Sequence, residues 1–179
     1  MKTSSGQAAV FFDRDGVLNV DTGYLHRVED FRWVQGARRA LRLVREANLI
    51  SIVVTNQSGI ARGFYREQEV EALHRWMNED LRKCAAEISA FYLCPYHYEG
   101  SVERYVVPDH QDRKPNPGML LRAIRDWNID PERSVMFGDK ESDMEAARRA
   151  GVAGVLFEGG DLAQAVSAWL RGRESSLTE

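Results

Sequence analysis

Short apolar runs alternate with amphipathic stretches along the chain, and this pattern predicts its secondary structure. The runs are rich in β-branched and aromatic side chains, as is typical of strands that are buried on both faces. They predict strands over Ala8–Phe12, Ile50–Val54, Ala90–Cys94, Ser134–Phe137 and Val152–Phe157.

Between these runs, apolar side chains recur every three or four residues, which is the spacing of an amphipathic helix. Ala37, Ala40, Leu41 and Val44 form one such stripe, with arginines on the opposite face. The same spacing predicts a long helix from Val70 to Ile88 and further helices over Met119–Trp127, Glu141–Ala150 and Leu162–Leu170. Gly151 stands where the C-terminus of a helix favours glycine.

Strands that alternate with helices indicate βαβ units and a parallel sheet. We therefore expect an α/β fold, a Rossmann-like three-layer sandwich with a central parallel sheet. The length of 179 residues suits a single domain, which we expect over residues 1–171. Residues 95–118 lack a period and hold four of the five prolines, so they predict a long loop inserted in that domain. The polar residues 172–179 predict a flexible tail.

The composition is that of a globular protein, with 44% hydrophobic and 28% charged residues. A net charge of −3 gives no electrostatic basis for binding nucleic acid or an anionic membrane. No apolar stretch approaches the roughly 20 residues of a membrane span, and the N-terminus has no signal-peptide pattern. The chain has two cysteines, Cys84 and Cys94, so we expect no disulfide framework and a location in the reducing cytoplasm. We also expect a monomer.

The first apolar run ends in two carboxylates, Asp13 and Asp15, and Gly16 follows them. Two acids spaced two residues apart on an extended segment face the same side. At the tip of a parallel strand they could bind a hard cation such as Mg²⁺, or share nucleophile and proton-transfer work. The pattern also fits a strand that ends in a turn with solvated acids.

Three further polar clusters follow later strands, at Thr55–Gly59, Arg113–Pro115 and Gly138–Lys140. Each alone fits a polar turn, but in a parallel sheet the carboxyl ends of all strands open on one edge, so the clusters converge. Asp13 and Asp139 could ligate Mg²⁺, Thr55 offers a hydroxyl, and Lys114 offers a positive charge. This set suits phosphoryl transfer, in which charge neutralisation and positioning dominate.

The order of these motifs resembles the haloacid dehalogenase superfamily of phosphatases, from about Val10 to Val155. Within it the chain is similar to the capless branch that holds the histidinol-phosphate and the heptose-1,7-bisphosphate phosphatases. The heptose type is favoured by the strings at residues 19–24, 59–63 and 99–103. The resemblance implies a fold without a separate cap domain and a small sugar phosphate as substrate, in the biosynthesis of nucleotide-activated heptose for lipopolysaccharide or another glycan.

The resemblance also implies roles for individual residues. Asp13 is the nucleophile, Asp15 the general acid and base, and Thr55 and Lys114 hold the phosphoryl group. Mg²⁺ is bound by Asp13, the Asp15 backbone and Asp139. Arg113 reads the substrate. The other residues expected to bind substrate are Arg14, Asn19, Asp21, Thr22, Gly23, Asn56, Gln57, Ser58 and Lys140. Asp143 is either a partner for a lysine or an acid in the first turn of a helix.

The chain departs from this family in the long loop, where a structural zinc is usually bound by Cys-x-His and Cys-x-Cys. Cys94 is present, but Tyr96 stands at the histidine position, and His110 and Asp112 replace the two cysteines. Tyrosine is not a usual zinc ligand. A rearranged zinc site from Cys94, His97, His110 and Asp112 is chemically feasible, but we expect the loop to be held without metal.

Other functions fit the same motifs. Histidinol-phosphate or another small sugar phosphate could be the substrate in place of the heptose bisphosphate. A nucleic-acid 3′-end phosphatase shares the Thr55-Asn56-Gln57 turn, but the acidic net charge argues against it. A non-catalytic binding module is disfavoured because no catalytic position is lost.

Overall fold

The computed structural model describes residues 6–176, and their core is one five-stranded parallel sheet. Its strands are β1 (Ala9–Phe12), β2 (Ile50–Asn56), β3 (Ala90–Cys94), β4 (Val135–Gly138) and β5 (Ala153–Leu156), in the order β3-β2-β1-β4-β5. In this register Phe12 at the end of β1 lies opposite Val53 of β2 and Phe137 of β4. The five predicted strands and their parallel sheet are confirmed.

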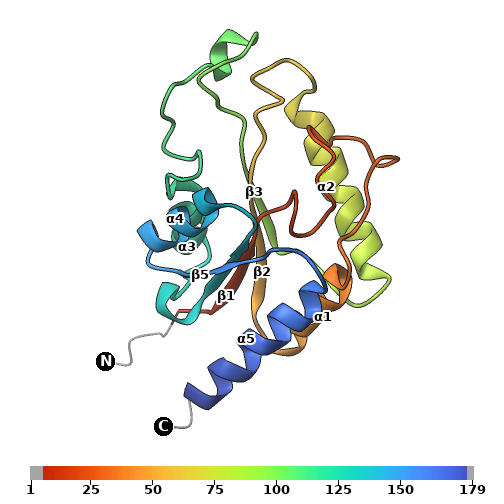
Figure 1. Ribbon diagram of the computed structural model, residues 1–179, viewed down its shortest axis with the longest axis vertical. Helices are drawn as coiled ribbons and strands as arrows, with labels where there is room; N and C mark the ends of the chain where they lie inside the picture. The colour runs from red at the N-terminus through yellow and green to blue at the C-terminus, as the bar shows by residue number, and fades with distance from the viewer. Residues whose placement is uncertain (1–5, 177–179) are drawn as a thin grey trace.

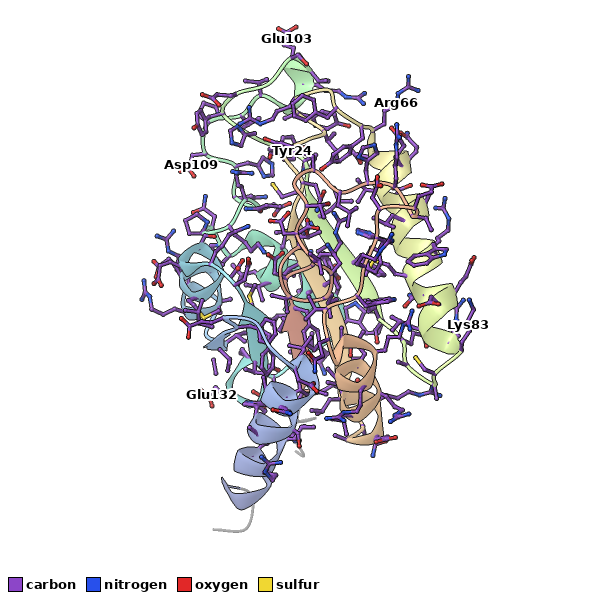
Figure 2. The ribbon with its side chains drawn as sticks, turned by 45° about the vertical axis from the view of Figure 1, so that its right-hand side comes forward. Tyr24, Arg66, Lys83, Glu103, Asp109 and Glu132 are labelled. Atoms are coloured by element: carbon purple, nitrogen blue, oxygen red, sulfur yellow. The ribbon has the colours of Figure 1, made fainter. Side chains whose placement is uncertain are left out.

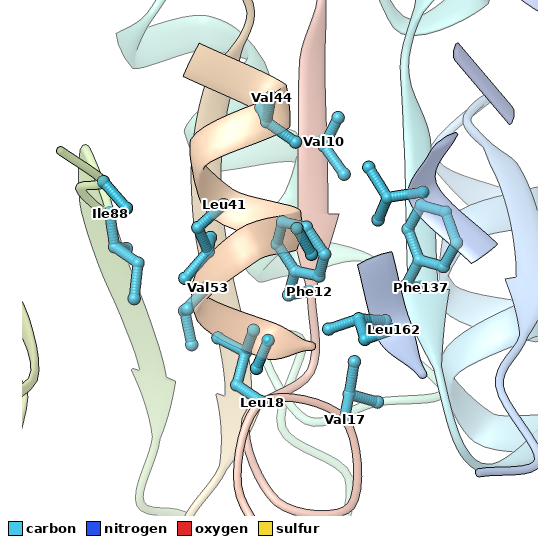
Figure 3. Close-up of a cluster of buried hydrophobic side chains, with 14 of the residues drawn as sticks. Val10, Phe12, Val17, Leu18, Leu41, Val44, Val53, Ile88, Phe137 and Leu162 are labelled. Carbon is cyan, nitrogen blue, oxygen red and sulfur yellow. The ribbon is translucent and has the colours of Figure 1, made fainter. Parts of the chain in front are cut away.

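Helices cover both faces of the sheet, which completes the predicted three-layer α/β sandwich (Figure 1). Alternate side chains of β1 explain the two cores. Val10 and Phe12 pack on one face, and Ala9 and Phe11 on the other. Figure 3 shows the first core, where side chains from the sheet meet those of α1 and α5. On this face lie α1 (Ala37–Glu46), α2 (Glu67–Arg82) and α5 (Leu162–Ser176), and on the other lie α3 (Gly118–Asp126) and α4 (Glu141–Arg149).

Two helices end elsewhere than their apolar spacing predicts. The long helix predicted to reach Ile88 ends at Arg82, because the chain turns at Ala85 with a left-handed φ of 56°. The Asn78 side chain then accepts from the Ile88 N–H and donates to the Ile88 carbonyl, which returns Ile88 to the core. At the other end of the chain, α5 continues to Ser176, so residues 172–176 of the predicted tail are helical. Residues 177–179 of that tail lie outside the described part.

Loops from β1, β2 and β3 gather beyond the carboxyl edge of the sheet. Figure 2 shows Tyr24, Glu103 and Asp109 together at this end of the molecule. The long loop between Cys94 and Gly118 is irregular, as predicted, apart from the 3₁₀ turn Glu103–Tyr105; a second such turn, Pro131–Arg133, precedes β4. Among residues 6–176, no helix has the length and apolar character needed to cross a membrane.

Candidate active site

The end of β1 places Asp13 at the floor of a pocket. The Asp13 N–H donates to the Phe137 carbonyl at 2.9 Å, which continues the pairing of β1 with β4 one residue beyond the strand. The residue is only 6% exposed, and the Oδ1 atom of its side chain lies 2.9 Å from Lys114 Nζ. The ladder of the sheet therefore fixes the backbone of the predicted nucleophile.

Hydrogen bonds fix both the backbone and the side chain of Lys114. The Asn56 amide, at the end of β2, donates to the Lys114 carbonyl and accepts from the Lys114 N–H, both at 3.1 Å. The Nζ atom then contacts Asp13 at 2.9 Å, Asp143 at 2.7 Å and the Val54 carbonyl at 2.9 Å. The ammonium group thus has three acceptors in a buried position.

Burial and charge act against each other on this pair. Burial raises the pKa of Asp13 to about 7, although the neighbouring Lys114 opposes the shift. For Lys114, burial lowers the pKa, but the charges of Asp13 and Asp143 outweigh it and the net shift is upward. Lys114 therefore stays charged. A second cation or a phosphoryl group beside Asp13 would change the pKa of its carboxyl group.

Asp13, Asp139 and Asp143 bring oxygen ligands within 4.8 Å of one another, and within residues 6–176 they form the group that could hold a metal ion. The carboxylate of Asp143 is already engaged by Lys114 and by the N–H groups of Asp139 and Lys140. Asp139 differs, because its Oδ1 atom is buried and has no hydrogen-bond partner. Asp13 and Asp139 are therefore the side chains that fit Mg²⁺, and Asp143 is the predicted partner of a lysine.

Gly16 allows Asp139 to approach the loop that follows β1. Its φ of +89° is one that residues with a side chain rarely adopt. A Cβ atom at this position would lie 2.3 Å from Asp139 Oδ2. The glycine after the two acids therefore suits both the turn and the close approach of Asp139, the predicted metal ligand.

Asp15 is surrounded by hydrogen-bond donors. Arg14 contacts its carboxylate through Nε and Nη2 at 3.1–3.2 Å, and the amides of Asn19 and Gln57 each donate to it at 2.9 Å. Arg14 is fully buried and also donates to the Leu25 carbonyl at 2.7 Å. Arg14 and Asn19, which the sequence predicts as substrate ligands, thus lie behind Asp15 and hold it.

The pocket has a volume of about 240 Å³. Nine of the predicted site residues line it, namely Asp13, Asp15, Asp21, Gly23, Asn56, Gln57, Ser58, Lys114 and Lys140. The lining does not include the other six predicted site residues, namely Arg14, Asn19, Thr22, Thr55, Arg113 and Asp139. Tyr24, Tyr65, Ser142 and Asp143 also line it, although the sequence did not single them out as substrate ligands. Tyr24 and Ser142 adjoin predicted positions, whereas no sequence pattern marked Tyr65.

Arg113 and the four candidate zinc ligands have other partners. Arg113 donates to the Tyr96 carbonyl at 3.2 Å, and burial lowers its pKa. The Asp112 side chain pairs with Arg122 at 3.1 Å, and the His110 ring stacks on Tyr96 with centroids 3.7 Å apart.

The remaining two candidates are also engaged within the chain. The His97 Nδ1 atom lies 3.0 Å from the Glu99 N–H, and burial raises the pKa of Cys94 to about 11, which favours the neutral thiol. These four side chains do not form a metal-binding group in the described part of the chain.

Comparisons with known proteins identify the family of the chain. A family model described as HAD-hydrolase-like matches residues 111–169. The D-glycero-β-D-manno-heptose-1,7-bisphosphate 7-phosphatase of Rhodopseudomonas palustris is 44% identical over 155 residues, which cover 86% of this chain and 85% of that protein. The enzyme of the same name from Escherichia coli K12 is 45% identical over 145 residues, 80% of this chain and 75% of its own length.

Solved structures are similar over most of the chain as well. A HAD-like phosphatase from Mesorhizobium loti has a TM-score of 0.81 and 39% identity, covering 87% of this chain and 74% of its own. The D,D-heptose 1,7-bisphosphate phosphatase of B. bronchiseptica, complexed with magnesium and phosphate, has a TM-score of 0.76 and 27% identity, covering 91% and 87%. The chain therefore belongs to the haloacid dehalogenase-like hydrolases, in the family of the heptose-1,7-bisphosphate 7-phosphatases.

Proposed function

We propose that this protein removes the 7-phosphate of D-glycero-D-manno-heptose 1,7-bisphosphate with the help of Mg²⁺, through a phosphorylated Asp13. The observation that carries the proposal is the buried contact of 2.9 Å between Asp13 and Lys114, beside the unpartnered Oδ1 atom of Asp139. A nucleophile and a phosphate-binding cation thus line one pocket, and a carboxylate oxygen of Asp139 lies within 4.8 Å of one of Asp13. The identity of 42–45% to curated enzymes with this name supports the substrate.

In the first step an Asp13 carboxylate oxygen attacks phosphorus, and the bond between phosphorus and the sugar oxygen breaks. Asp15 gives its proton to that leaving oxygen, and Lys114 offsets the negative charge on the phosphoryl oxygens. In the second step Asp15 takes a proton from the water that hydrolyses the aspartyl phosphate. Asp143 keeps the Lys114 ammonium beside Asp13 throughout. Mg²⁺, held by Asp13 and Asp139, would neutralise further charge on the phosphoryl group.

The rim of the pocket suits a small, exposed substrate. Asp21, Gly23 and Tyr24 form one side, and Lys140 reaches across to Asp21 with a separation of 3.8 Å. We propose that these loops take the place of a cap in choosing the sugar, with Arg113 as a further contact. Both Cys84 and Cys94 are free thiols, which supports a cytoplasmic protein, and we propose that it acts as a monomer.

Phosphate release measured with Mg²⁺ tests the proposal, with the heptose bisphosphate, histidinol phosphate and a 3′-phosphorylated DNA end compared by kcat/KM. We expect the heptose bisphosphate to be preferred and Asp13→Asn to lose activity by on the order of 10⁴-fold or more. Equal rates for wild type and Asp13→Asn would exclude the mechanism. A preference for histidinol phosphate or for DNA would exclude the substrate.

A further inference from the structure

Gln57 has no polar group left for a substrate, although it lies in the pocket wall. Its Nε2 atom donates to Asp15 Oδ2 at 2.9 Å and to Thr55 Oγ1 at 2.8 Å. Its Oε1 atom accepts from the Tyr65 hydroxyl at 2.8 Å, and the residue is only 2% exposed. The amide thus joins two predicted catalytic side chains to a tyrosine that no motif includes.

The ionised Asp15 carboxylate only accepts, so it requires the Nε2 end of this amide, and the Tyr65 hydroxyl stabilises the same orientation by donating to Oε1. A glutamine amide can turn by half a revolution at little cost, which would exchange its donor and acceptor ends. When Tyr65 donates to Oε1, both N–H groups point at Thr55 and Asp15. Without that hydroxyl, Oε1 would be a buried acceptor with no partner, and such an atom is costly to leave unpaired.

Tyr65 itself has little freedom to move. Its ring lies against the backbone of Gly59, where a Cβ atom would approach Tyr65 Cε1 to 2.3 Å. The His26 ring stacks on it with centroids 4.6 Å apart and an interplanar angle of 19°, and the His26 Nδ1 atom lies 2.9 Å from the Tyr24 carbonyl. Burial, the main cause, raises the pKa of Tyr65 to about 12, so the hydroxyl keeps its proton at neutral pH. The ring is thus a rigid support.

We propose that Tyr65 is a positioning residue, which acts through Gln57 to aim the Asp15 carboxyl group at the leaving oxygen of the substrate. The proposal rests on the proposed function of Asp15 as proton donor. Thr55 belongs to β2 and is held by its strand, so the loss of Tyr65 falls mainly on Asp15. Arg14 still donates to both oxygens of that carboxylate and Asn19 to Oδ1, so the effect is partial.

Leaving-group chemistry gives a specific test. When the phosphorus–oxygen bond of an alkyl phosphate breaks, the alkoxide must receive a proton, whereas acetate leaves acetyl phosphate without one. The proposal therefore predicts that Tyr65→Phe lowers kcat/KM for the sugar phosphate by about ten-fold and changes kcat/KM for acetyl phosphate by less than about three-fold. Tyr92→Phe is the matched control, because its hydroxyl bonds Asp126 at an exposed site and both ratios should stay at wild-type values.

A double-variant comparison guards against a general folding defect. Gln57→Met keeps the length of the side chain and removes the amide, so it breaks the hydrogen bonds that link Tyr65 to Asp15. The variant with both changes should lose no more activity on the sugar phosphate than Gln57→Met alone. Equal losses on the two substrate types, no loss in Tyr65→Phe, or additive losses in the double variant would each overturn the proposal.

The outcome is separable from that of the proposed substrate. If the wild type does not hydrolyse the heptose bisphosphate, glycerol phosphate serves as the alkyl phosphate in the same comparison. A larger loss of kcat/KM in Tyr65→Phe on glycerol phosphate than on acetyl phosphate would then support the role of Tyr65, even though the proposed heptose substrate would be excluded.

Discussion

The Nζ atom of Lys114 lies 2.9 Å from Oδ1 of Asp13, with both side chains almost fully buried. Asp143 holds the same ammonium group from the other side at 2.7 Å. The single Lys114 ammonium group therefore pairs with two carboxylates in a site that excludes most solvent. This imbalance of charge makes the site sensitive to mutation, to pH and to added cations.

Removing the lysine should destabilise the protein more than removing it together with one acid. Lys114→Met leaves Asp13 and Asp143 buried without their counter-ion, and we expect a loss of about 3–5 kcal/mol. Because a protein of this size loses roughly 2–4 °C per kcal/mol, the melting temperature should fall by roughly 6–20 °C. Lys114→Met/Asp143→Asn should recover part of this loss in the same thermal scan. A double variant as unstable as the sum of the single variants would contradict the shared ion pair.

The stability of the metal-free protein should depend on pH through Asp13. Burial raises the pKa of Asp13 from 3.8 to about 7, so between these values the folded state binds more protons than the unfolded state. Its contribution to the free energy of unfolding therefore falls as pH rises from about 4 to about 7. Urea unfolding at pH 5 and pH 8 should show a smaller pH difference in Asp13→Asn than in wild type. Identical pH differences would show that Asp13 is not held in this way.

Added Mg²⁺ should offset the loss of stability that follows when Asp13 ionises above about pH 7. A cation bound to ionised Asp13 and Asp139 offsets the cost of their burial and stabilises the folded state by mass action. At pH 8 we expect Mg²⁺ to raise the melting temperature of wild type more than that of Asp13→Asn. A matching rise in both proteins would place the cation elsewhere.

A methyl group at Gly16 should disturb Asp139, the proposed metal ligand. Its Cβ would lie 2.3 Å from Asp139 Oδ2, so Gly16→Ala should displace Asp139 and weaken Mg²⁺ binding, measured by calorimetry, by about ten-fold or more. Gly23→Ala is the matched control, because Gly23 also has a positive φ, +77°, but no atom lies within 4 Å of its Cβ position. Similar losses in both variants would indicate backbone strain and not a clash with Asp139.

The long loop should be held by ring stacking and not by zinc. The Tyr96 ring lies 3.7 Å from that of His110 and packs edge-on against Tyr105 at 5.9 Å. Tyr96→Ala should therefore lower stability by about 1–3 kcal/mol, measured by denaturant unfolding. A zinc chelator should leave the wild-type melting temperature unchanged. About one zinc per chain by elemental analysis would contradict this account of the loop.

Much of the fold follows from local patterns in the sequence. Buried strands and amphipathic helices depend on which side chains recur at steps of two, three or four, so the sheet, its helices and the positions of Asp13 and Asp139 at strand ends could be predicted. The ends of α2 and α5 could not, because the turn at Ala85 depends on the Asn78 amide, and α5 continues past its last apolar residues.

The partners of the site residues were decided by the tertiary structure. Lys114 reaches Asp13 from the other half of the chain, and Tyr65 reaches Gln57 only because their loop folds back over Gly59. The family resemblance predicted Arg14 and Gln57 as substrate ligands, whereas packing buries both of them beside Asp15. The sequence by itself determined which groups stand at the carboxyl edge. Only the close packing of distant segments decided which groups face the pocket and which hold the others, because hydrogen-bond partners depend on contacts that no local pattern encodes.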